Sequence, residues 1–132
     1  NGIYTRALAF AEEAARQGQL AQSVGLHIRA LLLAARASAA AGDPRQAHVR
    51  MEEAFQLVPQ DSATVERADC MVVLADLLEA GVLTSDRLPV SLLEEASELY
   101  KELGALKEAE KLTRRLKAMS STGEFVKVQA PS

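Results

Sequence analysis

Glycine spacing is the feature that most limits how this chain can fold. A glycine follows each of four stretches rich in alanine, leucine and charged residues, namely Gly18, Gly42, Gly81 and Gly104. Such a glycine is typical of a helix end, where one residue turns into the left-handed conformation. Asp43 before Pro44, and Asp61 or Ser62 further on, suit helix N-caps. The pattern predicts an all-α chain of about six helices, over residues 2–17, 20–41, 44–58, 61–80, 88–103 and 105–119.

The spacing also indicates an internal duplication. Gly18 lies 63 residues before Gly81, and Gly42 lies 62 residues before Gly104. A shift of 63 places Ala7 on Cys70, Phe10 on Val73 and Ala14 on Leu77, while a shift of 62 places Leu31 on Leu93 and Ala34 on Ala96. Chance agreement among alanine-rich helices is the other interpretation. We expect one helical-repeat domain over residues 1–119, with two similar three-helix halves at about 1–59 and 60–119, followed by a flexible tail over 120–132.

Composition excludes several classes of protein. The net charge is −3 with both signs interspersed, so no basic field favours nucleic acid as the primary ligand. No apolar run approaches the roughly 20 residues of a membrane span. The single cysteine, Cys70, has no second thiol to pair with, which favours a reducing, intracellular compartment such as the cytoplasm or nucleus. The chain begins at Asn1 and not at methionine, so we expect it to be a piece of a longer protein.

A repeat motif stands within residues 28–61. Small and apolar residues occur there at Leu31, Ala34, Ala35, Gly42, Ala47, Met51, Ala54 and Pro59. This arrangement resembles the tetratricopeptide repeat, a helical hairpin of about 34 residues. A weaker copy follows with Leu93, Ala96, Ser97, Tyr100, Gly104, Ala109 and Leu116, in which Thr113 replaces a large apolar residue. The resemblance implies antiparallel helical hairpins stacked as an α-solenoid, although the spacing of 62 departs from strict tandem repeats.

The resemblance also implies where a partner would bind. The first helix of each repeat lines the inner face in that family, and the matching positions here are Arg29, Leu32 and Arg36, then Glu94, Glu98 and Lys101. Asparagine, which clamps of C-terminal carboxylates use on this face, occurs only at Asn1. We therefore predict a groove for a protein or peptide partner at these six residues. A solvated helix face is the other interpretation of the two arginines.

Enzyme classes find little support in the residues. His27 and His48 stand on different predicted helices, and no Gly-rich phosphate loop or zinc-ligand spacing occurs. Cys70 lies among apolar neighbours, which is typical of a buried small residue and not of a nucleophile. We expect no catalytic residue, no metal and no cofactor.

Two functions are compatible with these patterns. The first is a non-catalytic interaction module or scaffold within a larger protein or complex, with a helix-lined groove and with end faces through which the chain could also self-associate. Its irregular repeats are similar to those of large scaffolding subunits. The alternative is an effector-binding regulatory domain similar to MalT-like bacterial regulators, which would hold a small molecule between helices.

Overall fold

The computed structural model describes residues 2–20, 24–59 and 63–121, and for residues 17–20 and 121 the backbone alone. The described residues form six helices and no strand: α1 (Gly2–Leu20), α2 (Val24–Ala40), α3 (Pro44–Leu57), α4 (Val65–Glu79), α5 (Pro89–Glu102) and α6 (Leu106–Ser121). The all-α prediction is confirmed. The tail was predicted to begin at Ser120, but Ser120 and Ser121 continue α6, and the rest of the predicted tail, residues 122–132, lies outside the described residues.

Three of the four glycines end helices as predicted. Gly42, Gly81 and Gly104 have φ angles of 81°, 76° and 77°, the left-handed conformation that costs glycine little. The prediction for Gly18 is wrong, because α1 continues through it to Leu20. A glycine inside a helix lowers the stability of the helix, but it ends the helix only where its backbone turns left-handed. The presence of a glycine therefore does not by itself distinguish a helix end, as at Gly42, from a helix interior, as at Gly18.

The helix starts show which capping residues the chain uses. Asp43 accepts a hydrogen bond from the backbone N–H of Gln46 at 3.1 Å, with Pro44 at the first helical position, as predicted. Helix α4 starts later than predicted. Its N-cap is Thr64, whose hydroxyl accepts a hydrogen bond from the backbone N–H of Arg67 at 3.1 Å.

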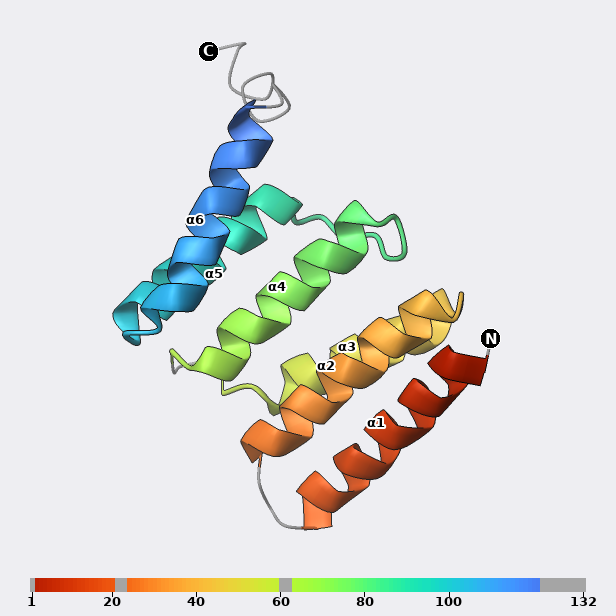
Figure 1. Cartoon of the computed structure of the whole chain (residues 1–132). Coiled ribbons are helices and arrows are strands. Elements are labelled where there is room, and N and C mark those ends of the chain that lie inside the picture. Colours follow the sequence, from red (N-terminus) through yellow and green to blue (C-terminus); the bar gives the residue numbers. More distant parts are fainter. Residues whose placement is uncertain (1, 21–23, 60–62, 122–132) are drawn as a thin grey trace.

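The helices are arranged so that α2, α4 and α6 share one side of the molecule (Figure 1). In that view α3 lies behind α2, α5 lies behind α6, and α1 runs along the outer side of α2. Contacts are extensive between consecutive helices in the groups α1, α2, α3 and α4, α5, α6, and α4 also contacts α2 and α3. Helix α4 therefore joins the first three helices to the last two.

The burial pattern of α4 explains this central position. One side of α4 packs with α2 and α3, through Cys70, Val73 and Leu77. The other side packs with α5 and α6, through Ala68, Met71 and Ala75. A helix that is apolar on two sides is buried between two layers, and it has no single solvent face.

The residues that carry the repeat motif are largely buried. In the first copy every motif residue within a helix is at most 3% exposed, namely Leu31, Ala34, Ala35, Ala47, Met51 and Ala54. In the second copy Leu93, Ala96, Ser97, Tyr100 and Ala109 are at most 4% exposed. Thr113 is exposed, which agrees with its polar side chain. The motif positions therefore form helix contacts, as close packing of small residues requires.

None of the helices in the described ranges is long and apolar enough to cross a membrane.

Candidate functional site

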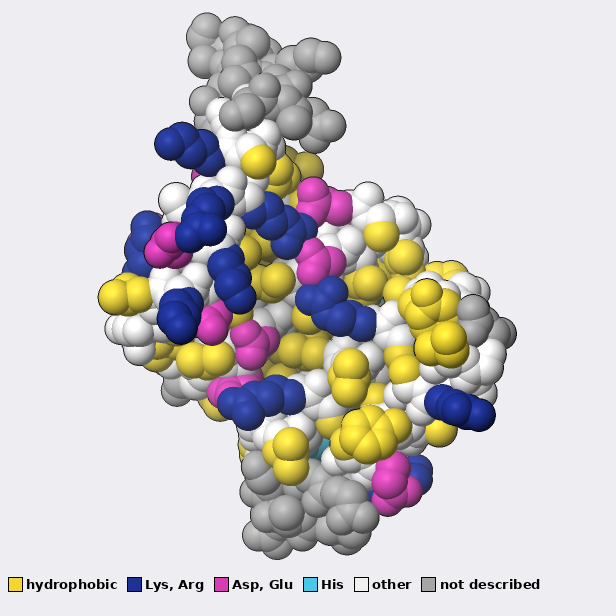
Figure 2. Space-filling view, in the orientation of Figure 1, with side chains coloured by type: hydrophobic (Ala, Val, Ile, Leu, Met, Phe, Trp, Pro, Cys, Tyr) yellow, Lys and Arg dark blue, Asp and Glu magenta, His cyan; other side chains and the backbone are white. Residues whose placement is uncertain are grey.

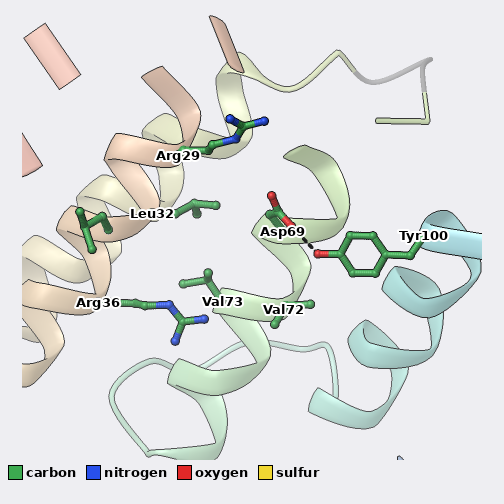
Figure 3. A pocket seen from close by; sticks show the side chains of 8 residues that line it. Arg29, Leu32, Arg36, Asp69, Val72, Val73 and Tyr100 are labelled. Carbon is green, nitrogen blue, oxygen red and sulfur yellow. Dashed lines mark hydrogen bonds between the residues drawn. The ribbon is translucent and has the colours of Figure 1, made fainter. Parts of the chain in front are cut away.

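A hollow of about 280 Å³ opens on the side of the molecule shared by α2 and α4 (Figure 3). Its walls come from three helices, with Arg29, Leu32, Leu33 and Arg36 from α2, Asp69, Val72 and Val73 from α4, and Tyr100 from α5. Four of these lining residues are aliphatic, namely Leu32, Leu33, Val72 and Val73, and three are charged, namely Arg29, Arg36 and Asp69. In Figure 3, Leu32 and Val73 face each other between the two arginines.

The two arginines are held at the rim by ion pairs to α4. Arg29 donates to Glu66 at 3.1 Å, and Arg36 donates to Asp76 at 2.8 Å. The arginine side chains remain 61% and 46% exposed. Exposed pairs of this kind add little to stability. Both guanidinium groups therefore keep surface that a partner can reach, while their carboxylate partners limit how they move.

Asp76 connects the hollow to the last helix. Besides Arg36 from α2, this carboxylate pairs with Arg115 from α6 at 2.6 Å, and Arg115 also pairs with Glu79. Burial lowers the pKa of Arg115, but hydrogen bonds to Glu79 and Asp76 outweigh it, so that the pKa lies above its ordinary value. One row of ion pairs thus links α2, α4 and α6 on the face in Figure 2, where charged side chains surround an apolar centre.

Asp69 and Tyr100 form the polar side of the hollow. The Tyr100 hydroxyl donates to a carboxylate oxygen of Asp69. Burial raises the pKa of Asp69, and the hydrogen bond from Tyr100 offsets part of that rise. Burial and the bond to Asp69 both raise the pKa of Tyr100. The tyrosine therefore stays a neutral donor, fixed between α4 and α5, and does not supply a phenolate for catalysis.

The structure separates the six residues predicted for the groove. Arg29, Leu32 and Arg36 line the α2–α4 hollow, which is the name used below for the hollow of Figure 3. Glu94, Glu98 and Lys101 line another hollow, of about 440 Å³, together with Ser97, Thr113 and Leu116. The two linings share no residue. Within the second hollow, Lys101 pairs with Glu98 at 3.7 Å.

The α4 side of the hollow was not predicted from the sequence. The sequence places Tyr100 among the motif positions and Val73 in the duplicated helix, and it assigns no role to Asp69 or Val72. A signal was present, because Glu66, Asp69 and Asp76 are spaced by three and seven residues and so share one face of a helix. Among the apolar residues of α4, that acidic stripe marked the face that meets the arginines of α2.

Cys70 is fully buried, and burial raises the pKa of its thiol to about 12. A thiol of this kind carries almost no thiolate at neutral pH. Within the described ranges, no three His, Cys, Asp or Glu side chains gather as ligands of a metal ion.

No protein-family model, no curated protein and no solved structure matches this chain.

Proposed function

We propose that this chain is a protein-interaction module that holds a segment of a partner protein across the α2–α4 hollow. The observation that carries the proposal is the apolar lining of Leu32, Leu33 and Val73 between two arginines that remain half exposed. Apolar anchors surrounded by a charged rim are typical of sites where proteins bind one another. The module is proposed to be tetratricopeptide-like, with its hairpins stacked as a solenoid and built into a larger assembly.

The size of the hollow favours one side chain of a partner over a whole small molecule. Ligand pockets usually have volumes of about 300–1,000 Å³ and enclose most of the ligand. The α2–α4 hollow, at about 280 Å³, lies just below that range. It suits an apolar side chain of an otherwise surface-bound peptide. The larger hollow between α5 and α6 is lined mostly by polar and charged residues, and this argues against the alternative, an effector-binding regulatory domain.

The charges suggest what the partner segment carries. Arg29 and Arg36 are seven residues apart, which is about 10 Å along a helix. A segment with an apolar residue between two carboxylates would place its apolar side chain near Leu32 and a carboxylate at each arginine. Each arginine would then share its guanidinium between the partner and its α4 carboxylate, so added salt should weaken capture.

The test replaces both arginines and measures capture of partners by the parent protein. The double variant Arg29→Gln, Arg36→Gln should lose one or more specific partners. The control, Arg45→Gln with Arg114→Gln, removes the same charge from residues that do not line the hollow. Thermal melts of both variants check the fold. If the Arg29, Arg36 variant is folded and still recovers every partner at the yield of the control, the hollow is not the binding surface.

A further inference from the structure

Asp69 supplies the acidic group in the lining of the α2–α4 hollow. In Figure 3 its carboxylate lies on the α4 wall, across from Leu32 of α2. One of its oxygens accepts a hydrogen bond from the hydroxyl of Tyr100. Within the part of the chain that the structure describes, no other group donates to this carboxylate. Because an ionised carboxylate can accept about four hydrogen bonds, Asp69 keeps unused acceptor capacity in the hollow.

The surroundings of Asp69 limit its contact with water. Burial is the largest cause of the rise in its pKa above the ordinary value. Leu32, Val72 and Val73 line the same hollow, and their side chains have no donor to offer. A donor brought by a partner would therefore meet a carboxylate that has already lost part of its hydration. Such a charge-assisted hydrogen bond is stronger than one between neutral groups.

The size of the hollow suits an aromatic ring. An apolar cavity of about 150 Å³ is large enough to bind benzene, and the α2–α4 hollow has a volume of about 280 Å³. It therefore has room for a ring and for a polar atom at the far end of that ring. The aliphatic side chains of the lining supply the apolar contacts that an aromatic ring needs, namely Leu32, Leu33, Val72 and Val73.

The charges of the lining favour a neutral donor over a cation. Arg29 and Arg36 line the hollow together with Asp69, and both carry the same charge as a lysine of a partner would. An ammonium group would also lose water among four aliphatic side chains, with a single carboxylate to compensate for it. The hydroxyl of a tyrosine and the indole N–H of a tryptophan donate hydrogen bonds without carrying a charge. Both residue types are frequent anchors of protein interfaces.

We propose that the partner side chain in the α2–α4 hollow is a neutral aromatic one with a hydrogen-bond donor at its end, a tyrosine or a tryptophan, and that Asp69 accepts the hydrogen bond from it. This inference rests on the proposed function, because it names the anchor of the same site. Tyr100 acts as a positioning residue, since its hydroxyl holds one oxygen of Asp69 and leaves the other oxygen for the partner.

The test uses peptides of the form Glu-Ala-X-Ala-Glu with blocked ends, in which X is tyrosine, phenylalanine or lysine. The two glutamates supply carboxylates for Arg29 and Arg36, and alternate side chains of an extended peptide lie on one face. Calorimetric titration of the full chain measures each dissociation constant. The tyrosine peptide should bind about tenfold more tightly than the phenylalanine peptide, which lacks only the hydroxyl, and more tightly than the lysine peptide. Equal binding of tyrosine and phenylalanine, tightest binding of lysine, or binding of none of them would overturn the proposal.

Asp69→Asn tests the hydrogen bond itself. The amide oxygen can still accept from Tyr100, and the amide NH₂ then replaces the oxygen that was left for the partner, so that a donor meets a donor. The preference for tyrosine over phenylalanine should disappear in this variant. Asp86→Asn is the control, because Asp86 is exposed and lies outside the lining, and it should keep the preference. A preference that survives Asp69→Asn at full size contradicts the role of Asp69.

Leu33→Asp separates this proposal from the proposed function, because it places a charge in the hollow. If tyrosine and phenylalanine peptides bind the wild type equally and Leu33→Asp abolishes binding of both, the hollow holds peptides without selecting for a donor. The aromatic-donor proposal then fails and the proposed function stands. If the peptides bind and a folded Leu33→Asp variant binds them as tightly as the wild type, they bind elsewhere, and both proposals fail.

Discussion

Arg36 of α2 and Asp76 of α4 form an ion pair at 2.8 Å, and the same carboxylate also binds Arg115 of α6 at 2.6 Å. One side chain on the central helix thus contacts both neighbouring helices on the face of the hollow. Pairs that share a carboxylate form a network, and networks contribute more than isolated surface pairs.

Replacing the shared carboxylate should therefore lower stability measurably. Asp76→Asn leaves Arg36 without its charged partner and leaves Arg115 with Glu79 alone, and we expect the free energy of unfolding to fall by about 0.5–1.5 kcal/mol at low salt, and by less at high salt. Urea unfolding at two salt concentrations measures it. The control Glu110→Gln breaks a pair with Arg114 within α6, with side chains 62% and 73% exposed, and should cost less. Equal losses for the two variants would show that Asp76 is an ordinary surface carboxylate.

The close contact of α2 with α3 yields a packing prediction. Ala35 and Ala47 are both 0% exposed in the core that α2 and α3 form. Ala35→Leu should overpack that contact and lower the free energy of unfolding by ~1–3 kcal/mol. Ala40→Leu, on the exposed end of the same helix, is the control and should change stability little. A thermal melt of Ala35→Leu that matches the wild type would contradict the motif alignment.

Protonation of Asp69 should leave a mark on the pH dependence of stability. Burial raises the pKa of this carboxyl in the folded protein above its ordinary value of 3.8. Over the interval from that value up to the raised pKa, the folded state binds more protons than the unfolded state, so this group makes stability fall as pH rises. Asp69→Asn keeps an acceptor for Tyr100 and removes the titration. The stability of the wild type relative to Asp69→Asn should therefore decline across this interval, and a constant difference would refute the prediction.

Cys70 should report on opening of the core. Its side chain is fully buried and its thiol pKa is raised to about 12, so alkylation at pH 8 should be very slow in the folded protein and fast in denaturant. Ala75→Leu or another change that loosens α4 should speed the reaction in proportion to the loss of stability. Rapid labelling of the native wild type would contradict the buried position of Cys70.

The sequence predicted those features that depend on local chemistry. Helix number, the Asp43 cap and the ends at Gly42, Gly81 and Gly104 follow from residue types and backbone conformations that act over a few residues. The prediction of a helix end at Gly18 was wrong, because a glycine alone does not end a helix, and α1 continues through Gly18 to Leu20.

The α2–α4 hollow was harder to predict, because it is assembled from separate helices. Leu32 and its two flanking arginines could be identified on one helix. Their neighbours Asp69 and Tyr100 come from α4 and α5, and the packing angle between helices brings them together. Sequence periodicity gives the face of each helix and does not give that angle. For the same reason Glu94 and Lys101 were joined to Arg29 in one predicted groove, whereas the structure places them in another hollow.

The most direct test of the central claim places a charge inside the hollow. Leu33 lines it and is 45% exposed, while Val49 on α3 is 40% exposed and lies outside its lining, so the two residues are matched in size class and exposure. Affinity capture with the parent protein should lose specific partners in Leu33→Asp and keep them in Val49→Asp, with both variants melting near the wild-type temperature. Identical recovery of every partner by Leu33→Asp and Val49→Asp would contradict a binding role for the α2–α4 hollow.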